Sequence, residues 1–270
     1  MIAKLRAAAF LLVVALSAGT LTPRMASAQD ESTGAEISPD SLRALVAAAA
    51  QGHAVAQYNL GVMYGTGDGV PENNAEAVRW YRAAAEQGHA AAQFSLGSMY
   101  STGDGVPENN AEAVRWYRAA AEQGHATAQF SLGVMYDFGE GVPENNAEAV
   151  RWYRAAAEQG LAYVQSLLGD MYADGLGVRE DDVEAVHWYR AAAEQGWASA
   201  QYNLGLMYAN GEGVPENQVM AYAWINLAAA QGYGNSQEVK DSLSQKMTNE
   251  QVAQAQALSL ELLERINGPR

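Results

Sequence analysis

The chain has 270 residues, with 31 Asp and Glu against 16 Lys and Arg, a formal net charge of −15, and no cysteine. Nucleic acids and anionic membrane surfaces are themselves negatively charged, so this balance disfavours both as partners and is explained most simply by solubility. Without cysteine, neither a disulfide nor a lipid-modified cysteine can form, and an exported form of the chain must be held together by packing alone.

The N-terminal segment has the pattern of a cleaved export signal. Two basic residues precede an apolar run at 7–16 that is too short to span a bilayer, and a small-x-small sequence ends at Ala28. We therefore expect a signal peptide at 1–28, cleavage after Ala28, a polar leader at 29–37, and a periplasmic or secreted protein. The alternative is an uncleaved membrane anchor. Cleavage would leave 13 basic and 31 acidic residues, a formal charge of −18.

The next segment is predicted to form a helix that begins at Ser38-Pro39 and runs to Gln51. It aligns with the second helix of the repeating unit that follows, and it has no first helix before it. A terminal half unit has this form, so we assign 38–52 as an N-terminal capping helix.

Most of the chain repeats with a period of 36 residues. Glycine, tyrosine and Gln-Gly keep this step, and the clearest series is Trp80, Trp116, Trp152, Trp188 and Trp224. A fixed period of this length indicates a stacked array in place of one globule. The five full repeats are 53–88, 89–124, 125–160, 161–196 and 197–232.

Each repeat is predicted to consist of two helices. In the first repeat, residues at i, i+4 and i+8 form one packing face over 54–64, and Gly67 ends this helix. Asn73 is a good N-cap for the second helix, with Glu76 three residues later as in a capping box. The second helix is expected to end near Gln87.

Two closing helices are predicted at 236–246 and 248–266. Thr248 and Gln251 have the spacing of a capping box at the start of the second one. Their polar outer faces would shield the last repeat, so we assign 233–270 as the C-terminal cap.

The stretch LGVMYGTGDGVPENNAEAVRWYRAAAEQGHAAAQ resembles the Sel1-like repeat, a 36-residue relative of the tetratricopeptide repeat. The Leu-Gly, Tyr-x-x-Gly-x-Gly-Val, Ala-x-x-Trp and Ala-Ala-x-x-Gly elements carry the resemblance, which covers about 53–232. It implies an all-α fold, a right-handed α-solenoid of helix pairs whose first helices line a concave face. It also implies an adaptor that holds other proteins, and some exported bacterial members are linked to envelope or host interaction. A cysteine-rich group associated with penicillin binding is a weak analogy, because this chain has no cysteine.

The first three repeats differ from one another only in the first helix or just after it. In the numbering of the first repeat, the varied positions are 55, 58/59, 62 and 65/66, which form one stripe along the helix. Drift on a solvent-facing stripe is one explanation. However, the outward positions of the second helix are identical in these repeats, and drift should have changed both helices. We therefore predict that the stripe lines a groove that binds a peptide or protein.

The predicted groove combines aromatic anchors, hydrogen-bonding groups and, toward the third and fourth repeats, negative charge, which together suit a protein surface. The alternative for the aromatic residues is partial burial between the first helices of adjacent repeats, so the polar residues are the better candidates. The predicted groove residues are Val55, Tyr58, Asn59, Val62, Phe94, Ser95, Ser98, Phe130, Ser131, Asp137, Phe138, Tyr163, Asp170, Asp174, Tyr202 and Asn203.

No catalytic, cofactor or metal site is predicted. His53, His89 and His125 recur at the repeat period, too far apart for one metal ion, and the motifs of common hydrolases and metalloenzymes are absent. The Gly-x-Gly stretch at 65–69 follows a helix and precedes a proline, so it is interpreted as a turn. We expect a non-enzymatic monomer that binds a protein or peptide. The alternative is a cell-envelope enzyme or glycan-binding module, related to peptidoglycan or β-lactams, that uses the same groove.

Overall fold

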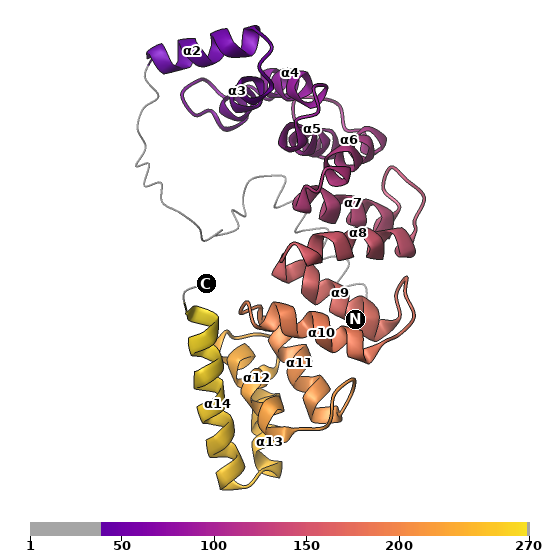
Figure 1. Cartoon of the computed structure of the whole chain (residues 1–270), viewed down its shortest axis with the longest axis vertical. Coiled ribbons are helices and arrows are strands. Elements are labelled where there is room, and N and C mark those ends of the chain that lie inside the picture. The colour runs from indigo at the N-terminus through magenta and orange to yellow at the C-terminus, as the bar shows by residue number, and fades with distance from the viewer. Residues whose placement is uncertain (1–38, 269–270) are drawn as a thin grey trace. The chain divides into compact units, whose positions relative to one another are not determined.

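The computed structural model describes residues 39–268, which form helices and turns and contain no strand (Figure 1). The half unit is α2 (Pro39–Ala50). The first helices of the repeats are α3 (Ala54–Thr66), α5 (Ala90–Thr102), α7 (Ala126–Phe138), α9 (Ala162–Asp174) and α11 (Ala198–Asn210). The second helices are α4 (Asn74–Ala85), α6 (Asn110–Glu122), α8 (Asn146–Glu158), α10 (Asp182–Ala193) and α12 (Gln218–Ala230). The closing helices are α13 (Ser236–Lys246) and α14 (Asn249–Asn267).

The predicted all-α solenoid of helix pairs is therefore confirmed over the described residues. The predicted signal peptide, its cleavage site and the polar leader lie outside them. The chain divides into an N-terminal unit, residues 1–145, and a C-terminal unit, residues 146–270. Within the N-terminal unit each helix from α2 to α7 packs on the next, and within the C-terminal unit the same holds from α8 to α12, after which α13 and α14 both pack on α12.

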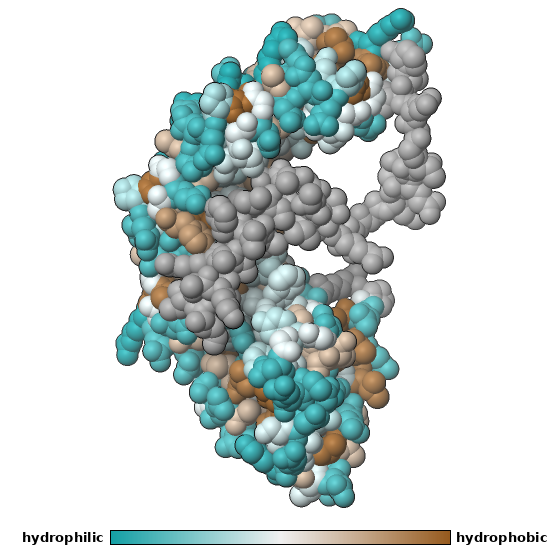
Figure 2. All heavy atoms as spheres, turned by 180° about the vertical axis from the view of Figure 1, so that it is seen from behind, coloured by the Kyte–Doolittle hydropathy of each residue, from teal (hydrophilic) through white to brown (hydrophobic). Residues whose placement is uncertain are grey.

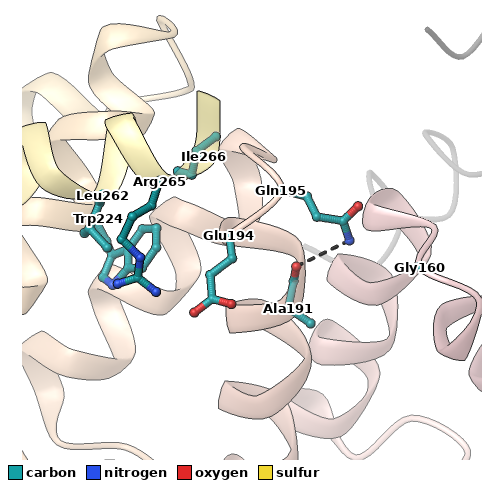
Figure 3. A pocket seen from close by; sticks show the side chains of 8 residues that line it. All are labelled: Gly160, Ala191, Glu194, Gln195, Trp224, Leu262, Arg265 and Ile266. Atoms are coloured by element: carbon teal, nitrogen blue, oxygen red, sulfur yellow. Dashed lines mark hydrogen bonds between the residues drawn. The ribbon is translucent and has the colours of Figure 1, made fainter. Parts of the chain in front are cut away.

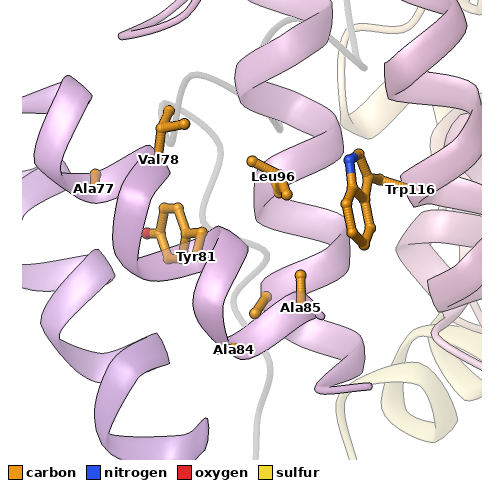
Figure 4. Close-up of a cluster of buried hydrophobic side chains, with 8 residues drawn as sticks. Ala77, Val78, Tyr81, Ala84, Ala85, Leu96 and Trp116 are labelled. Atoms are coloured by element: carbon orange, nitrogen blue, oxygen red, sulfur yellow. The ribbon is translucent and has the colours of Figure 1, made fainter. Parts of the chain in front are cut away.

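Buried alanines let the helices of the N-terminal unit approach one another closely. Figure 4 shows one such cluster, in which the Tyr81 ring and Leu96 lie between alanines of α4 and the Trp116 indole of α6. Each large apolar side chain buried in this way contributes about 1.5–3 kcal/mol. The cluster contains Ala77, Val78, Tyr81, Ala84, Ala85, Ala92, Leu96 and Trp116.

The glycine in the middle of each first helix is required by contact with the second helix of the same repeat. A Cβ atom at Gly97 would lie 2.7 Å from the Tyr117 ring, and one at Gly169 would lie 2.6 Å from the Tyr189 ring. Distances below 3.0 Å are not tolerated without movement of the ring. The 36-residue spacing of these glycines is therefore a packing requirement of the helix pair.

Gly67 and Gly69 lie in a turn, as predicted, whereas Gly65, also assigned to that turn, still belongs to α3. Gly67 has a φ of 74° and its N–H donates to the Met63 carbonyl at 2.9 Å, which ends α3. A Cβ atom at Gly105 would lie 2.3 Å from the Asn74 carbonyl carbon. The loop after α5 therefore lies directly against the start of α4 in the preceding repeat, and only glycine fits there.

The capping box predicted at Asn73 is half formed. The Asn73 side chain accepts the Glu76 N–H at 3.2 Å, but the Glu76 carboxylate pairs with Arg79 at 3.2 Å instead of returning to Asn73. The complete box forms at the start of α14, where Thr248 and Gln251 each bond to the other's backbone N–H.

A ladder of glutamine side chains joins the two ends of each repeat and ties the repeat to the unit before it, a feature absent from the sequence predictions. The buried Gln57 amide donates to the Ala49 carbonyl at 3.2 Å and accepts from Gln87 at 2.6 Å, so its polar atoms are satisfied. The other rungs are Gln123–Gln93, Gln195–Gln165 and Gln231–Gln201. The recurring Gln-Gly pairs thus supply hydrogen bonds within each repeat as well as helix ends.

Candidate partner-binding surface

The variable stripe lies along the seam between consecutive first helices. In the C-terminal unit, three side-chain hydrogen bonds each join residues 33 positions apart. They are Ser166–Ser199 at 3.0 Å, Asn203–Asp170 at 3.0 Å and Tyr202–Asn235 at 2.9 Å. A stripe residue therefore packs against the helix that follows, and its identity depends partly on its neighbour across the seam.

The aromatic stripe residues of the N-terminal unit stack on the histidine that begins the next first helix. The Tyr58 and His89 rings are 4.8 Å apart, and the Phe94 and His125 rings are 5.0 Å apart. Burial lowers the pKa of His125, whose Nδ1 accepts the Ala128 N–H at 3.2 Å and caps α7. The structure therefore favours partial burial between first helices for Tyr58 and Phe94, the alternative to their being free anchors.

The predicted groove residues fall into three groups by exposure. Exposed residues are Val55, Asn59 and Asp174. Half-buried residues are Tyr58, Val62, Phe94, Ser95, Phe138, Tyr163, Asp170, Tyr202 and Asn203. Buried residues are Ser98, Phe130, Ser131 and Asp137. The last four offer no surface to a partner here, and for Ser98 the reason is visible, since its hydroxyl oxygen accepts from the buried Tyr117 hydroxyl at 3.3 Å.

The C-terminal unit brings five of the predicted residues close together. We define the Asp170 patch as seven residues of α9, of α11 with its N-cap, and of the turn after α12. They are Tyr163, Ser166, Asp170, Trp197, Ser199, Asn203 and Tyr233. Tyr202 and Asp174 adjoin the patch, because the Tyr202 ring lies 5.7 Å from that of Tyr233 and Asp174 follows Asp170 by one helical turn.

The fourth repeat exchanges an aromatic contact for a polar one. In the first repeat, Tyr58 covers the Tyr81 ring at 5.9 Å, but Ser166 occupies the same repeat position and instead meets Ser199. Tyr163, one turn earlier, contacts Trp197 at 6.3 Å. Trp197 is 40% exposed and Tyr233 is 38% exposed, so aromatic surface is available at both ends of the patch.

Asp170 is the most perturbed carboxylate of the described residues. Burial raises its pKa to about 7, against the opposing effect of hydrogen bonds from the Tyr189 hydroxyl at 2.7 Å and Asn203 at 3.0 Å, and Asp174 raises it further. Both hydrogen bonds fall on Oδ1. Burial, followed by the charge of Asp170, also raises the pKa of Tyr189.

Sequence reasoning missed Trp197, Tyr233, Tyr189 and the serine pair. Trp197 and Tyr233 stand where the earlier repeats have histidine, directly before the helix positions that were compared. Extending the comparison of the first three repeats to positions 197 and 233 would have found both. Tyr189 has no such signal, because tyrosine occupies its position in the first four repeats.

A separate cavity of about 470 Å³ lies at the ends of the second helices, away from the stripe (Figure 3). Glu194 of α10 and Arg265 of α14 reach into it beside the Trp224 indole. No group of His, Asp or Glu among residues 39–268 is placed to hold a metal ion, and within that range no helix is long and apolar enough to cross a membrane.

The face shown in Figure 2 is mostly hydrophilic, with hydrophobic residues in scattered groups. The strongly exposed apolar residues Val55, Val183 and Leu260 come from different helices. Binding through one wide apolar patch on that face is therefore not indicated.

A family model for the Sel1 repeat matches the chain five times. The matched ranges are 54–89, 90–125, 126–161, 162–197 and 198–233. Each match begins one residue after the boundary drawn from the sequence, at the first residue of a first helix.

Several solved structures are similar to the chain. A Sel1 repeat protein from Oxalobacter formigenes is 36% identical over 84% of this chain and 93% of its own, with a TM-score of 0.70. A protective antigen of uropathogenic Escherichia coli with an SLR fold is 29% identical over 84% of this chain and 64% of its own, with a TM-score of 0.44. A Sel1 repeat protein from Klebsiella pneumoniae is 25% identical over 74% of this chain and 98% of its own, with a TM-score of 0.43.

A comparison with functionally curated proteins gives no match. The five matched repeats, together with the identity to the Oxalobacter protein over most of both chains, establish the relationship. The protein belongs to the Sel1 repeat family, whose members are typically scaffolds for protein interaction.

Proposed function

We propose that the protein is an exported, non-catalytic adaptor that holds a protein or peptide partner on the surface of its first helices, chiefly at the Asp170 patch. The observation that carries this proposal is the composition of the patch. It places two exposed aromatic rings beside a half-buried carboxylate and several hydroxyl and amide groups. Aromatic anchors with adaptable polar neighbours are typical of protein interfaces.

Packing of the repeats does not require this composition. At the repeat position of Asp170 the first three repeats have Val62, Ser98 and Val134, and at the position of Trp197 they have histidine. These repeats form the same helix pairs with ordinary residues. The unusual side chains of the fourth and fifth repeats are therefore free to serve a role other than folding.

A smaller surface in the N-terminal unit supports the same proposal. Val55 is 61% exposed and Asn59 is exposed, one turn apart on α3. They correspond in repeat position to Tyr163 and to Asn203. Equivalent positions of the first helices are thus open to a partner within each unit taken by itself.

Export is proposed from the N-terminal sequence alone. The test is the mass and N-terminal sequence of the protein recovered from periplasmic and culture fractions. A mature chain beginning at Gln29 is expected. A full-length chain in the membrane fraction would contradict cleavage and support the anchor.

Partner capture is tested by crosslinking in the native cell followed by purification. The variant Tyr163→Ala with Trp197→His gives both positions residues found in the other repeats, so it should fold. The matched control is Val183→Ala on α10, whose side chain is 65% exposed outside the patch. We expect the double variant to lose the crosslinked partner and the control to keep it. Equal capture by both would overturn the adaptor role of the patch.

A glycan-binding module or an envelope enzyme is the second candidate, favoured by the exposed Trp197 ring in the same patch as the Asp170 carboxylate. A stacked sugar ring and a carboxylate acceptor would suit these groups. Hydrolysis of peptidoglycan or of a β-lactam by the purified protein, lost in Asp170→Asn, would establish that alternative in place of the adaptor.

A further inference from the structure

Asp170 is a negative charge for which the described part of the chain supplies no positive partner. Its two hydrogen bonds come from neutral groups, and both reach Oδ1, while Oδ2 receives none from residues 39–268. None of the ion pairs found in that range involves Asp170. A half-buried carboxylate without a counter-charge is unfavourable, and a cation that arrives from outside would relieve it.

The arginines of the second helices on either side of α9 are already engaged by tyrosine hydroxyls, and Arg179, which follows α9, is exposed and is not among the ion pairs found within residues 39–268. Arg154 donates to Tyr172, and Arg190 donates to the Tyr208 hydroxyl at 2.9 Å. The same contact recurs in the N-terminal unit, where Arg82 donates to Tyr100 at 2.8 Å. These arginines are therefore part of the repeat frame, and the fold does not direct them to Asp170.

The surroundings of Asp170 offer acceptors and aromatic faces, which suit a cation and not an anion. The half-buried Ser199 contributes a hydroxyl oxygen, which the buried Ser166 hydroxyl holds at 3.0 Å, and Asp174 adds a second carboxylate one turn along α9. Trp197 and Tyr233 expose aromatic surface, and ring faces attract ammonium and guanidinium groups. A phosphate or carboxylate ligand would find no cation here to bind it.

We infer that the Asp170 patch binds a cationic side chain of the partner, a lysine or arginine held by the Asp170 carboxylate between the rings of Trp197 and Tyr233. The inference rests on the adaptor function proposed above and specifies the chemistry of the partner. A metal ion is a poorer occupant, because no three metal-ligating side chains converge within residues 39–268.

The patch fits a side chain of a peptide better than a free amine. Aromatic contacts extend from Tyr163 and Trp197 at one end to Tyr202 and Tyr233 at the other. Such a length offers contacts to the residues on either side of the bound lysine or arginine. The partner is therefore expected to be an extended segment with a basic residue flanked by residues able to contact aromatic rings.

Binding of a cation at Asp170 competes with binding of a proton, so the affinity should depend on pH. The titratable groups that face Asp170 are Asp174 on α9, Tyr189 on α10 and Tyr233 in the turn after α12; α11 contributes the neutral Asn203. Burial raises the pKa of both tyrosines, which stay neutral below pH 8. Because the pKa of Asp170 is about 7, cation binding should strengthen between pH 6 and pH 8.

The test uses the full mature chain and two fluorescent peptides, acetyl-Gly-Tyr-Lys-Tyr-Gly-amide and the same peptide with the lysine Nε-acetylated. Fluorescence anisotropy at about 150 mM salt limits non-specific attraction to the acidic chain. We expect the lysine peptide to bind at least about tenfold more tightly than its acetylated form at pH 8, with several-fold weakening at pH 6. Asp170→Asn should remove both effects.

Glu86→Gln is the matched control, because it removes one exposed acid from the N-terminal unit and should leave binding within about twofold. Asp170→Ser, which introduces the residue found at position 98, provides a second variant if Asp170→Asn does not fold. Equal binding of the two peptides by the wild-type chain, or unchanged selectivity in both Asp170 variants, would overturn the inference. Partner capture that depends on Trp197 but not on Asp170 would refute the cation site and leave the adaptor proposal standing.

Discussion

The N-terminal and C-terminal units share one frame but fill the seam of their first helices differently. At equivalent positions, Tyr117 donates to Ser98 in the second repeat, and Tyr189 donates to Asp170 in the fourth. The first pair is a buried hydrogen bond between neutral groups, which simply satisfies two polar atoms. The second includes a carboxylate whose charged form is costly in that place. The same tyrosine is therefore a packing residue in one unit and part of a candidate site in the other.

The largest effect on stability is expected from substitution of the glycine in the middle of a first helix, because the helix pairs of both units depend on it. Gly97→Val and Gly169→Val both force carbon atoms into a tyrosine ring, and each should lower the free energy of unfolding by about 3 kcal/mol. Urea unfolding followed by circular dichroism measures this change. Because the contact is the same in both units, the two losses should agree within about 1 kcal/mol. A tolerated substitution in either unit would show that its helix pair is less tightly packed than the other.

The Asp170 carboxylate should make the stability of the protein depend on pH. Its pKa is about 7 in the folded chain and 3.8 ordinarily, so the folded state holds the proton more tightly, and stability falls as the pH rises from 4 to 7. Allowing for partial exposure, Asp170→Asn should raise the free energy of unfolding by about 2 kcal/mol at pH 8 and by little at pH 4.

Urea unfolding of wild type and Asp170→Asn at both pH values measures the effect. Asp174→Asn is the control, because Asp174 is exposed and should change the pH dependence far less. Parallel stability curves for wild type and Asp170→Asn across this range would contradict a perturbed carboxylate.

Placing a carboxylate at the equivalent position of the N-terminal unit should make the stability of that unit depend on pH in the same way. Ser98→Asp places a carboxylate next to the buried Tyr117 hydroxyl, in the position that Asp170 has beside Tyr189. We expect a loss of about 1–2 kcal/mol at pH 8 that is recovered toward pH 4. Urea unfolding at the two pH values measures this loss. A loss independent of pH would indicate steric damage instead of a buried charge.

The sequence predicted the frame of the fold well because each part of it depends on local chemistry. Glycine at a helix end, asparagine before a helix and an apolar face at i, i+4 are properties of a single helix and its cap. The glutamine ladder escaped prediction because its partners, such as Gln57 and Gln87, are 30 residues apart and meet only once helices are stacked.

The exposure of the variable stripe was partly predicted wrongly, again because the contacts that bury it form only when helices stack. A first helix in this array packs against its own second helix and the second helix before it, and side chains of its stripe also meet the next first helix. The sequence comparison treated the unvaried face as the packed one and the varied stripe as free. Ser98 and Phe130 show that a varied position can be fully buried, and Ser98 does so by accepting from Tyr117 of its own second helix. The Asp170 patch was partly found because Tyr163 and Asp170 depart from every other repeat in chemical type.

The smallest expected difference separates the fourth repeat from the first three and lies on the outer side of the second helices. In the first three repeats an arginine pairs with the glutamate one turn before it and lies over the adjacent tryptophan; Arg115, for example, is 3.3 Å from Glu112 and its guanidinium is 4.5 Å from the Trp116 ring. The fourth repeat has His187 in this place, edge-on to Trp188.

His187→Arg should restore the pair with Glu184 and raise the free energy of unfolding by about 0.5 kcal/mol, since exposed pairs contribute little. Thermal unfolding at low and high salt measures it, and the gain should shrink at high salt because ions screen the pair. A gain that survives high salt would assign the stabilisation to contact with the indole ring, and a loss would mean that the histidine of the fourth repeat is better suited to its surroundings than the arginine of the other three.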